Sequence, residues 1–171
     1  MNTYQLEAVV TEDRYSQDMF VGVFPMDRLP KQFKTPACMI INSASSSSQG
    51  EHWLAVFIDQ YGRGEFFDSY GHSADFYNQR LEDFLRRNCS THSFNTRELQ
   101  TLWSNVCGQY CLFYFIHRCR QISAHDIIYQ FSRNKLINDQ RVNDFIRKHY
   151  SSLCKIHENT HLKFFANQLC C

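Results

Sequence analysis

The stretch CGQYCLFYFIH, residues 107–117, constrains the fold of this chain more than any other. It is helical in length and apolar on most sides. A helix that is hydrophobic nearly all round must be covered by other elements, so we expect it to be buried at the centre of the molecule. Ser104 or Asn105 is available as its N-cap, because such side chains accept hydrogen bonds from first-turn N–H groups. Cys107 would then stand in the opening turn.

The residues ahead of this helix favour strands, because short runs of β-forming residues alternate with turn-forming segments. The first runs are VGVF at 21–24 and ACMIINS at 37–43, with a charged, proline-containing loop at 26–36 between them. HWLAVFID at 52–59 and GEFFDSYG at 64–71 predict a hairpin turning at QYGR. The serine-rich segment 43–51 predicts a flexible surface loop inside the domain.

Helices are predicted to follow the strands. Between Ala74 and Arg87 apolar residues recur at helical spacing, and the segments 123–132 and 138–150 predict two more helices, with Ser123 and Asn138 at their starts. An early sheet followed mainly by helices indicates an α+β fold. A chain of 171 residues, 43% of them hydrophobic, is long enough for one core and short for two. We therefore expect residues 1–171 to form a single domain.

Composition favours a soluble, intracellular and monomeric protein. The first thirteen residues lack the basic start and apolar core of a secretory signal, and apolar runs such as CLFYFI are far too short to cross a bilayer. Reduced thiols are then the expected state of the eight cysteines. Residues 118–171 carry nine Lys and Arg against four Asp and Glu, a basic third that fits either an anionic partner or a solvated face.

Cys107 is a candidate nucleophile. A cysteine attacks only as the thiolate, and local positive potential is needed to stabilise that form. The first turn of a helix supplies it, because its N–H groups are unpaired and the helix dipole favours negative charge. The same N–H groups can stabilise the oxyanion that forms when a thiolate attacks an amide carbonyl. Gly108 has no side chain and would let a substrate backbone come close. The alternative is a buried cysteine that only fills space.

A nucleophilic cysteine also needs a base, and the base needs an orienting carboxylate. His52 opens the first strand of the predicted hairpin, and Asp68 lies near the end of the second. The two residues are therefore expected at corresponding ends of neighbouring strands, where Nδ1 of the histidine could meet the carboxylate. Each signal is weak alone, and their combination favours a catalytic site.

Two segments carry a family resemblance. They are GEHWLAVFIDQYGRGEFFDSYG at 50–71 and QTLWSNVCGQYCLFYF at 100–115. The pattern is a His-Trp pair opening a strand, an acidic residue soon followed by glycine, and a glutamine seven positions ahead of Cys-Gly. Together they resemble the catalytic core of adenain, the family of adenovirus cysteine proteases and their relatives in adenovirus-like viruses and mobile elements. The opening part also resembles the family, with YQLEAVV at 4–10 as a short helix.

This resemblance implies a papain-like cysteine protease of the adenain type, in which a small mixed sheet packs on a central helix that starts at the catalytic cysteine. It implies a triad of Cys107, His52 and Asp68. It also implies that Gln100 gives an amide N–H to the oxyanion hole, beside the backbone N–H of Cys107. Trp53 would shape the pocket of the base, with plain core packing as the alternative.

The implied function is cleavage at Gly-containing sites of viral or transposon structural precursors during virion maturation, in the host nucleus or cytoplasm and in the virion. The acid departs from the pattern, since the adenovirus enzyme has glutamate where this chain has Asp68. Aspartate occurs in more distant proteases that process ubiquitin-like modifiers. A protease that deconjugates ubiquitin-like proteins, and an inactive binding module that keeps the fold, are therefore the alternatives.

The resemblance also implies an activating partner. In the adenovirus enzyme, a cysteine eleven residues ahead of the oxyanion glutamine forms a disulfide with a short precursor-derived peptide, and DNA assists activation. Cys89 stands eleven residues ahead of Gln100 in a polar segment, near Arg86 and Arg87, which could favour its thiolate. The basic C-terminal third could contact DNA. No metal or organic cofactor is expected, because Cys107 and Cys111 lack two further ligands at suitable spacing.

Overall fold

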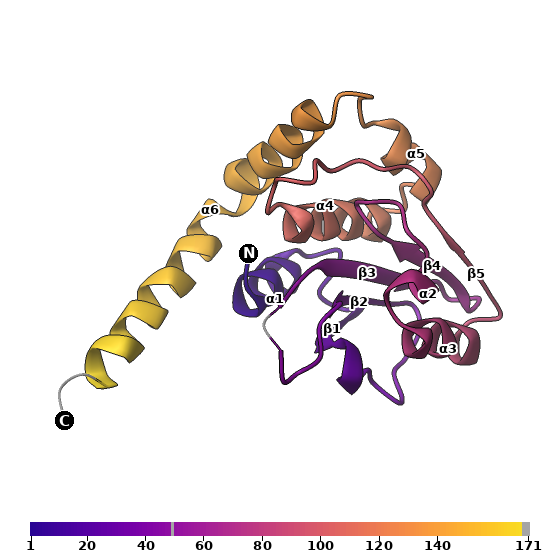
Figure 1. Cartoon of the computed structure of the whole chain (residues 1–171), viewed down its shortest axis with the longest axis horizontal. Coiled ribbons are helices and arrows are strands. Elements are labelled where there is room, and N and C mark those ends of the chain that lie inside the picture. The colour runs from indigo at the N-terminus through magenta and orange to yellow at the C-terminus, as the bar shows by residue number, and fades with distance from the viewer. Residues whose placement is uncertain (49, 169–171) are drawn as a thin grey trace.

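The computed structural model describes the backbone of residues 1–48 and 50–168 and the side chains of residues 1–48, 50–150 and 153. Cys170 and Cys171, and the side chains of Lys155 and Lys163 in the basic third, lie outside the described residues. Five strands form one mixed sheet, with helices on both of its faces (Figure 1). The architecture is α+β, as the order of elements predicts.

The strands are β1 (Phe20–Pro25), β2 (Ala37–Asn42), β3 (Trp53–Ile58), β4 (Arg63–Phe67) and β5 (Thr91–Phe94). They lie in this order across the sheet. β2, β3 and β4 pair antiparallel, while the outer strands β1 and β5 are parallel to their neighbours. The predicted hairpin of β3 and β4 is confirmed. The sequence does not predict β5, because this short edge strand is mostly exposed and lacks a hydrophobic pattern.

The helices are α1 (Thr3–Glu12), α2 (Ala74–Tyr77), α3 (Gln79–Asn88), α4 (Cys107–Cys119), α5 (Ala124–Tyr129) and α6 (Lys135–Gln168), with a 3₁₀ turn η1 at Met26–Arg28. The continuous helix predicted over 74–87 is wrong. Asn78 is extended, with φ −167° and ψ 136°, and its side chain accepts a hydrogen bond from the Arg80 N–H at 2.9 Å. The chain therefore ends α2 and starts α3 at this residue.

The last helix starts earlier than its sequence pattern indicates. α6 begins at Lys135 rather than at Asn138, because Asn134 accepts a hydrogen bond from the Leu136 N–H at 3.0 Å. It continues beyond the predicted end, through a kink at Tyr150, where φ is −136° and ψ is 17°. At the other end of the chain α1 is present as expected, and a reciprocal pair of hydrogen bonds between Asn2 and Gln5 starts it.

The central strands are buried on both faces, so the core has two halves. Along β2, Cys38 and Ile40 belong to the half that includes α1 and α4, while Met39 and Ile41 belong to the half that includes α3. This split follows from the alternation of side chains along a strand. It explains why β2 and β3 are continuous apolar runs rather than alternating ones.

The helix that the sequence places at the centre is confirmed there. α4 packs across the sheet, and most of its side chains are buried. The ring of Tyr114 stacks on Phe67 of β4, with 4.4 Å between centroids. Glu65 of β4 accepts hydrogen bonds from the Tyr114 hydroxyl at 2.6 Å and from Arg118 at 2.6 and 2.9 Å. These contacts fix the helix along β4 and so fix the position of its first residue, Cys107.

Candidate active site

The nucleophile candidate stands at an open helix end. Cys107 is the first residue of α4, and the residue before it, Val106, makes no side-chain cap hydrogen bond. The predicted cap is therefore wrong. Ser104 instead donates its hydroxyl to the Thr101 carbonyl at 3.3 Å, and Asn105 is exposed. Since no side chain caps this end, its N–H groups and the positive end of the helix dipole remain available to an anion.

The hairpin brings His52 and Asp68 together. His52 immediately precedes β3, Asp68 immediately follows β4, and the pairing of Ala55 with Phe67 sets them side by side. The distance from His52 Nε2 to Asp68 Oδ1 is 2.7 Å. The sequence predicts Nδ1 for this contact, which is wrong. Cys107 and His52 each shift the pKa of the other. Because His52 Nε2 contacts Asp68, Nδ1 is the nitrogen that remains for the thiol.

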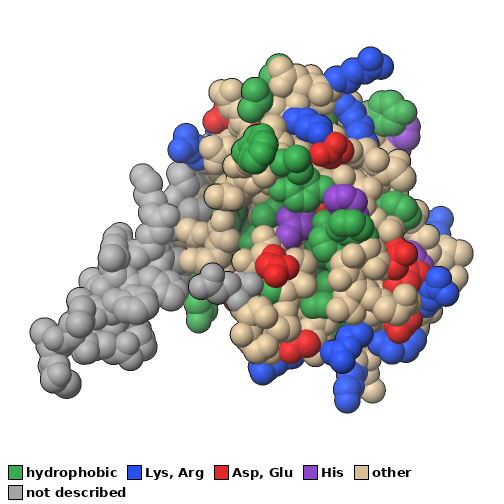
Figure 2. Space-filling model, in the orientation of Figure 1, with side chains coloured by type: hydrophobic (Ala, Val, Ile, Leu, Met, Phe, Trp, Pro, Cys, Tyr) green, Lys and Arg blue, Asp and Glu red, His purple; other side chains and the backbone are tan. Residues whose placement is uncertain are grey.

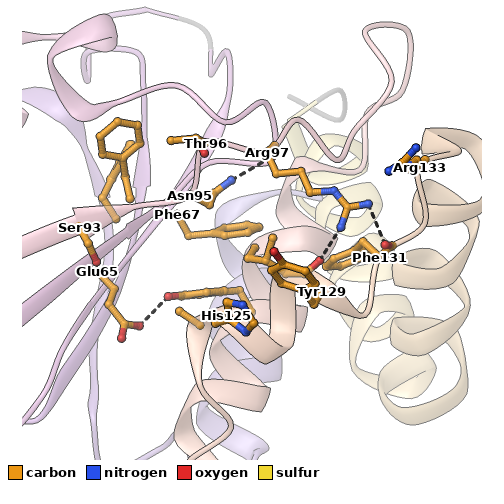
Figure 3. Close-up of a pocket in the computed structure, with 15 residues that line it drawn as sticks. Glu65, Phe67, Ser93, Asn95, Thr96, Arg97, His125, Tyr129, Phe131 and Arg133 are labelled. Atoms are coloured by element: carbon orange, nitrogen blue, oxygen red, sulfur yellow. Dashed lines mark hydrogen bonds between the residues drawn. The ribbon is translucent and has the colours of Figure 1, made fainter.

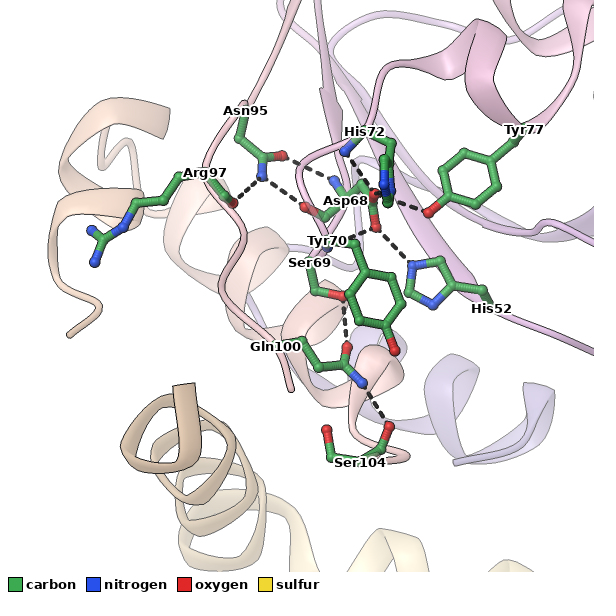
Figure 4. Close-up of polar contacts among 10 residues, drawn as sticks. All are labelled: His52, Asp68, Ser69, Tyr70, His72, Tyr77, Asn95, Arg97, Gln100 and Ser104. Atoms are coloured by element: carbon green, nitrogen blue, oxygen red, sulfur yellow. Dashed lines mark hydrogen bonds and ion pairs between the residues drawn. The ribbon is translucent and has the colours of Figure 1, made fainter. Parts of the chain in front are cut away.

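Asp68 is fully buried and surrounded by donors. Besides His52, its Oδ1 accepts from the Tyr70 N–H at 3.0 Å. Its Oδ2 accepts from the His72 N–H at 2.9 Å and the Tyr77 hydroxyl at 2.9 Å, and lies 3.1 Å from His72 Nδ1 (Figure 4). Burial alone would raise the pKa of Asp68, but these hydrogen bonds, led by that of His52, lower it. The carboxylate is therefore ionised and held in one orientation.

Two tyrosine rings flank the base. Tyr70 stacks on His52 at 4.8 Å between centroids, and Tyr77 stacks on it at 5.7 Å. In Figure 4 the imidazole lies between the two rings. Sequence reasoning does not find Tyr70, Tyr77 or His72. The three residues follow Asp68 within nine positions, but nothing in their spacing shows that the chain folds back over its own carboxylate.

Charge favours an ion pair between Cys107 and His52. Burial would raise the pKa of Cys107, but the hydrogen bond and the charge of His52, with a hydrogen bond from the Trp53 backbone N–H, lower it. Burial likewise would lower the pKa of His52, but hydrogen bonds to Asp68 and Cys107 outweigh it and raise that pKa to about 9. The two shifts therefore favour a thiolate at Cys107 paired with an imidazolium at His52.

Gln100 is almost fully buried and is held by two hydrogen bonds. Its Oε1 accepts from the Ser69 hydroxyl at 2.7 Å, and its Nε2 donates to the Ser104 carbonyl at 2.8 Å. The two contacts orient the amide, because a hydroxyl and a carbonyl require opposite ends of it. One N–H of the amide remains for another acceptor.

Trp53 and Gly108 have packing roles that the sequence leaves open. The Trp53 indole N–H donates to the Met1 carbonyl at 3.1 Å, and its ring packs against the core. A Cβ on Gly108 would lie 3.2 Å from Leu6 and 3.3 Å from Trp53. The expectation that Gly108 opens space for a substrate is therefore corrected, since its missing side chain lets α1 and Trp53 approach α4.

Cys89 does not have the environment that the sequence suggests. It ends α3 just before β5, and it is half-buried against the core rather than exposed in a loop. A Cβ on Gly64 would lie only 2.4 Å from its sulfur. Burial, followed by the nearby charge of Asp59, raises the pKa of Cys89 to about 11. Arg86 is paired with Glu82 instead, so the expectation of a favoured thiolate is wrong.

Several cavities lie outside this cluster, and two of them are close to elements that carry it. One, of about 710 Å³, lies between β4, β5 and α5, with Phe67, Tyr129 and Arg97 among its lining residues (Figure 3). The other, of about 880 Å³, opens beside Trp53 and is bounded by the start of α1 and the serine-rich loop. On the face shown in Figure 2, histidine side chains gather near the middle among hydrophobic ones. Within the described part of the chain, no cluster of three His, Cys, Asp or Glu could hold a metal ion.

The match to known proteins agrees with this geometry. Residues 20–168 match the family model of the adenovirus endoprotease. The chain belongs to the adenovirus endoprotease family. A protease of human adenovirus B serotype 3 is 31% identical over 131 residues, which cover 66% of this chain and 61% of that protein. A protease of porcine adenovirus A serotype 3 is 32% identical over 90 residues, covering 45% of this chain and 44% of that protein.

This family member spans between 44% and 61% of the length of the curated relatives compared with it. Among solved structures, the ASFV pS273R protease has a TM-score of 0.53 at 19% identity, over 82% of this chain and 65% of that one. ChlaDub1 from Chlamydia trachomatis has a TM-score of 0.50 at 15% identity, over 68% and 60%. At these identities the likeness concerns the fold alone, and the adenain type rests on the match to the family model. No helix among the described residues is both long and apolar enough to span a membrane.

Proposed function

We propose that this chain is a cysteine endopeptidase that uses Cys107, His52 and Asp68. The observation that carries the proposal is the position of His52, which is bonded to a buried carboxylate and lowers the pKa of a thiol at a helix N-terminus. Membership in the adenovirus endoprotease family supports it.

In the proposed mechanism the Cys107 thiolate attacks the scissile carbonyl and forms a C–S bond. The carbonyl oxygen becomes an oxyanion, which the N–H of Cys107 and the free amide N–H of Gln100 stabilise. The C–N bond then breaks, and the His52 imidazolium gives its proton to the leaving amine. Water, deprotonated by His52, hydrolyses the thioester and restores the thiol. Asp68 keeps the imidazole oriented throughout.

For the substrate, we propose Gly-containing sites in viral or transposon structural precursors, cleaved during virion maturation inside the host cell and the virion. The cavity beside Trp53 supports an extended polypeptide substrate, since Trp53 follows the proposed base and packs against Gly108, the residue after the proposed nucleophile. Leu102 and Trp103, which are 69% and 91% exposed in the loop before Cys107, support contact with an apolar part of a polypeptide.

Asp68 is the observation that favours a second candidate, a protease acting on folded ubiquitin-like fusions. The two candidates predict different substrates. Cleavage of an intact ubiquitin-like fusion at a rate at least equal to that of a Gly-Gly precursor peptide would favour the second one. Binding of either substrate without turnover would favour an inactive binding module.

Activation by a precursor-derived peptide at Cys89 and by DNA is also proposed from the family. The raised pKa of Cys89 disfavours spontaneous oxidation at neutral pH, so the proposal requires that the peptide supply the thiolate. Mass spectrometry of the oxidised mixture tests it, and absence of a mixed disulfide at Cys89 would contradict it.

The basic third is partly committed to internal contacts. Arg118, Arg120 and Lys135 pair with Glu65, Asp13 and Glu98. Arg147 and Lys148 of α6 are exposed. A DNA contact through them would weaken as salt rises. Fluorescence anisotropy with duplex DNA tests this, and equal affinity of the variant with Arg147→Ala and Lys148→Ala would contradict it.

The central test uses four variants and a fluorogenic Gly-Gly peptide. Cys107→Ala should abolish turnover and leave the circular dichroism spectrum unchanged, because little volume is removed. His52→Ala should lower kcat/KM by about 10²–10⁴-fold, as expected for loss of a general base. Gln100→Ala should lower kcat by about 10²–10³-fold through loss of an oxyanion donor. Cys111→Ser is the matched control, because that thiol is buried in the same helix. Turnover by Cys107→Ala near that of the wild type would overturn the proposed function.

A further inference from the structure

Tyr70 contacts the site through both its side chain and its backbone. Its ring stacks on the His52 imidazole at 4.8 Å with 25° between the planes, and its backbone N–H donates to Asp68. Tyr70 directly follows Ser69, whose hydroxyl orients Gln100. The residue is therefore joined to the base, to the acid and, through its neighbour, to the proposed oxyanion donor.

The hydroxyl of Tyr70 extends past these contacts. In Figure 4 it points to the side where the amide of Gln100 and the second nitrogen of His52 lie. No hydrogen bond to this hydroxyl is found among the residues that the structure describes, whereas the Tyr77 hydroxyl, on the other side of His52, is bonded to Asp68. Tyr70 is half-buried, so its hydroxyl is at the edge of the site rather than enclosed in the core.

The charge of the nucleophile also acts on the Tyr70 hydroxyl. Burial raises the pKa of Tyr70, and the negative charge of Cys107 raises it further. The phenol is therefore neutral at physiological pH and can donate a hydrogen bond. The pKa of Cys107 is lowered mainly by His52 and by the Trp53 backbone. The Tyr70 hydroxyl is not among these causes. The hydroxyl is therefore a donor that is left for another acceptor.

We propose that the Tyr70 hydroxyl is a third donor to the oxyanion of the tetrahedral intermediate, beside the Cys107 N–H and the Gln100 amide. The inference rests on the proposed cysteine protease function. In the step concerned, the C–S bond forms and the carbonyl electron pair moves onto oxygen. Tyr70 donates a hydrogen bond to that oxygen and keeps its proton. The proton that the leaving amine takes comes from His52.

A purely structural role for Tyr70 makes a different prediction. Stacking on His52 needs only the ring, which phenylalanine also provides. A hydroxyl that contacts the oxyanion acts only while that oxygen carries charge, so its loss should lower kcat and leave KM unchanged. It should not change the reaction of the thiolate with an alkylating reagent, which forms no oxyanion.

The experiment compares the wild type with Tyr70→Phe and with Tyr61→Phe, an exposed tyrosine in the β3–β4 turn. Three quantities are measured: kcat and KM for a fluorogenic Gly-Gly peptide, the inhibition constant of a Gly-Gly peptide aldehyde, and the rate of Cys107 alkylation by iodoacetamide. The aldehyde adds to a thiol to give a tetrahedral carbon bearing oxygen, so it reports on the oxyanion site directly.

For Tyr70→Phe we expect kcat to fall by about 10-fold to 10²-fold, toward the range seen for loss of a single oxyanion donor. The aldehyde should bind more weakly by a similar factor. KM and the alkylation rate should stay at the wild-type values, and Tyr61→Phe should match the wild type throughout.

Either of two results would overturn the inference and leave the proposed function standing. One is a Tyr70→Phe variant equal to the wild type in kcat and in aldehyde affinity. The other is an alkylation rate that falls by the same factor as kcat, which would mean that the hydroxyl acts on the thiolate. A wild-type protein that neither cleaves the peptide nor binds the aldehyde would overturn the proposed function itself, and the inference with it.

Discussion

At the scale of single residues, the protonation states of Cys107 and His52 define the site. Cys107 has a lowered pKa and His52 a pKa raised to about 9, because each stabilises the charged form of the other. Below pH 9 the imidazolium is present, and above the pKa of Cys107 the thiolate is present. The reactive ion pair is therefore favoured between these two values.

This gives a prediction for selective labelling. At pH 7, iodoacetamide should modify Cys107 much faster than Cys89, whose pKa of about 11 leaves it protonated. Peptide turnover should decline as the pH rises through about 9, because His52 then loses the proton that the leaving amine needs. Labelling followed by peptide mass spectrometry measures both thiols in one sample. Similar rates at the two cysteines at pH 7 would contradict the assigned ion pair.

Asp68→Asn tests the acid, and the structure suggests a cost in stability as well as in rate. Each oxygen of the Asp68 carboxylate accepts from a backbone N–H, of Tyr70 at Oδ1 and of His72 at Oδ2, so the amide NH₂ of asparagine would face a donor in either orientation. We expect a loss of about 1–3 kcal/mol in the free energy of unfolding, the usual cost of an unsatisfied buried polar group.

The activity of Asp68→Asn should fall less than that of His52→Ala, because an orienting group contributes less than the base that it orients. Urea unfolding and kcat/KM at a temperature where the variant is folded give the two quantities. Rates equal to those of the wild type would remove Asp68 from the site.

At the scale of elements, the loop after β4 shapes the site. Gly71 has φ +79°, and a Cβ there would lie 2.9–3.0 Å from backbone atoms of Thr96 and Arg97. Gly62 has φ +76°, but a Cβ there would meet nothing closer than 3.7 Å. Alanine at Gly62 therefore tests the cost of a left-handed backbone alone, whereas alanine at Gly71 adds the cost of a steric clash.

Gly62→Ala should lower the free energy of unfolding by about 1–2 kcal/mol through backbone strain alone. Gly71→Ala should lower it further, and it should also lower kcat, because the loop that holds His72 and Tyr70 against Asp68 must move. Urea unfolding of both variants checks the difference. An equal loss at the two positions would mean that the segment at Thr96 and Arg97 yields without cost.

Sequence patterns predict the elements that are held by hydrophobic burial. The apolar helix at Cys107 and the hairpin from His52 to Asp68 are where their patterns place them, since burial of one face leaves a period in the sequence and burial of all faces leaves a continuous apolar run. β5 and the break at Asn78 leave no such period, because a short exposed edge strand and a side-chain cap depend on single hydrogen bonds.

The same contrast holds within the site. The residues with chemistry in their side chains, Cys107, His52, Asp68 and Gln100, stand in a recognisable order. The structure joins His52 to Asp68 by a hydrogen bond, His52 lowers the pKa of Cys107, and Gln100 is held by Ser69. Tyr70 stacks on His52, while Tyr77 and Asn95 form hydrogen bonds with Asp68. Their positions follow from how the loop folds back, which only the three-dimensional structure contains.

At the scale of the whole molecule, one buried carboxylate joins three distant segments. Asp13, at the end of α1, accepts hydrogen bonds at 2.7 Å from Arg120, at the end of α4, and from the hydroxyl of Tyr150, at the kink of α6. This carboxylate therefore joins α1, α4 and α6. These helices belong to the layer that carries Cys107.

Asp13→Ala should lower the free energy of unfolding by about 1–3 kcal/mol, because Arg120 and the Tyr150 hydroxyl lose a common acceptor. Asp18→Ala is the matched control, since Asp18 is exposed and surface substitutions usually change stability by less than about 0.5 kcal/mol. Urea unfolding followed by circular dichroism measures both. A loss at Asp13 no larger than at Asp18 would mean that this junction contributes nothing.

The thiol comes from the helical layer, whereas the base and the acid come from the sheet, 55 and 39 residues earlier in the chain. During synthesis the ribosome therefore releases His52 and Asp68 before Cys107 exists. Until α4 docks on the sheet, the emerging chain carries an ordinary cysteine with ordinary reactivity. In the proposed mechanism, the reactive pair of Cys107 and His52 therefore forms only after α4 has packed on the sheet.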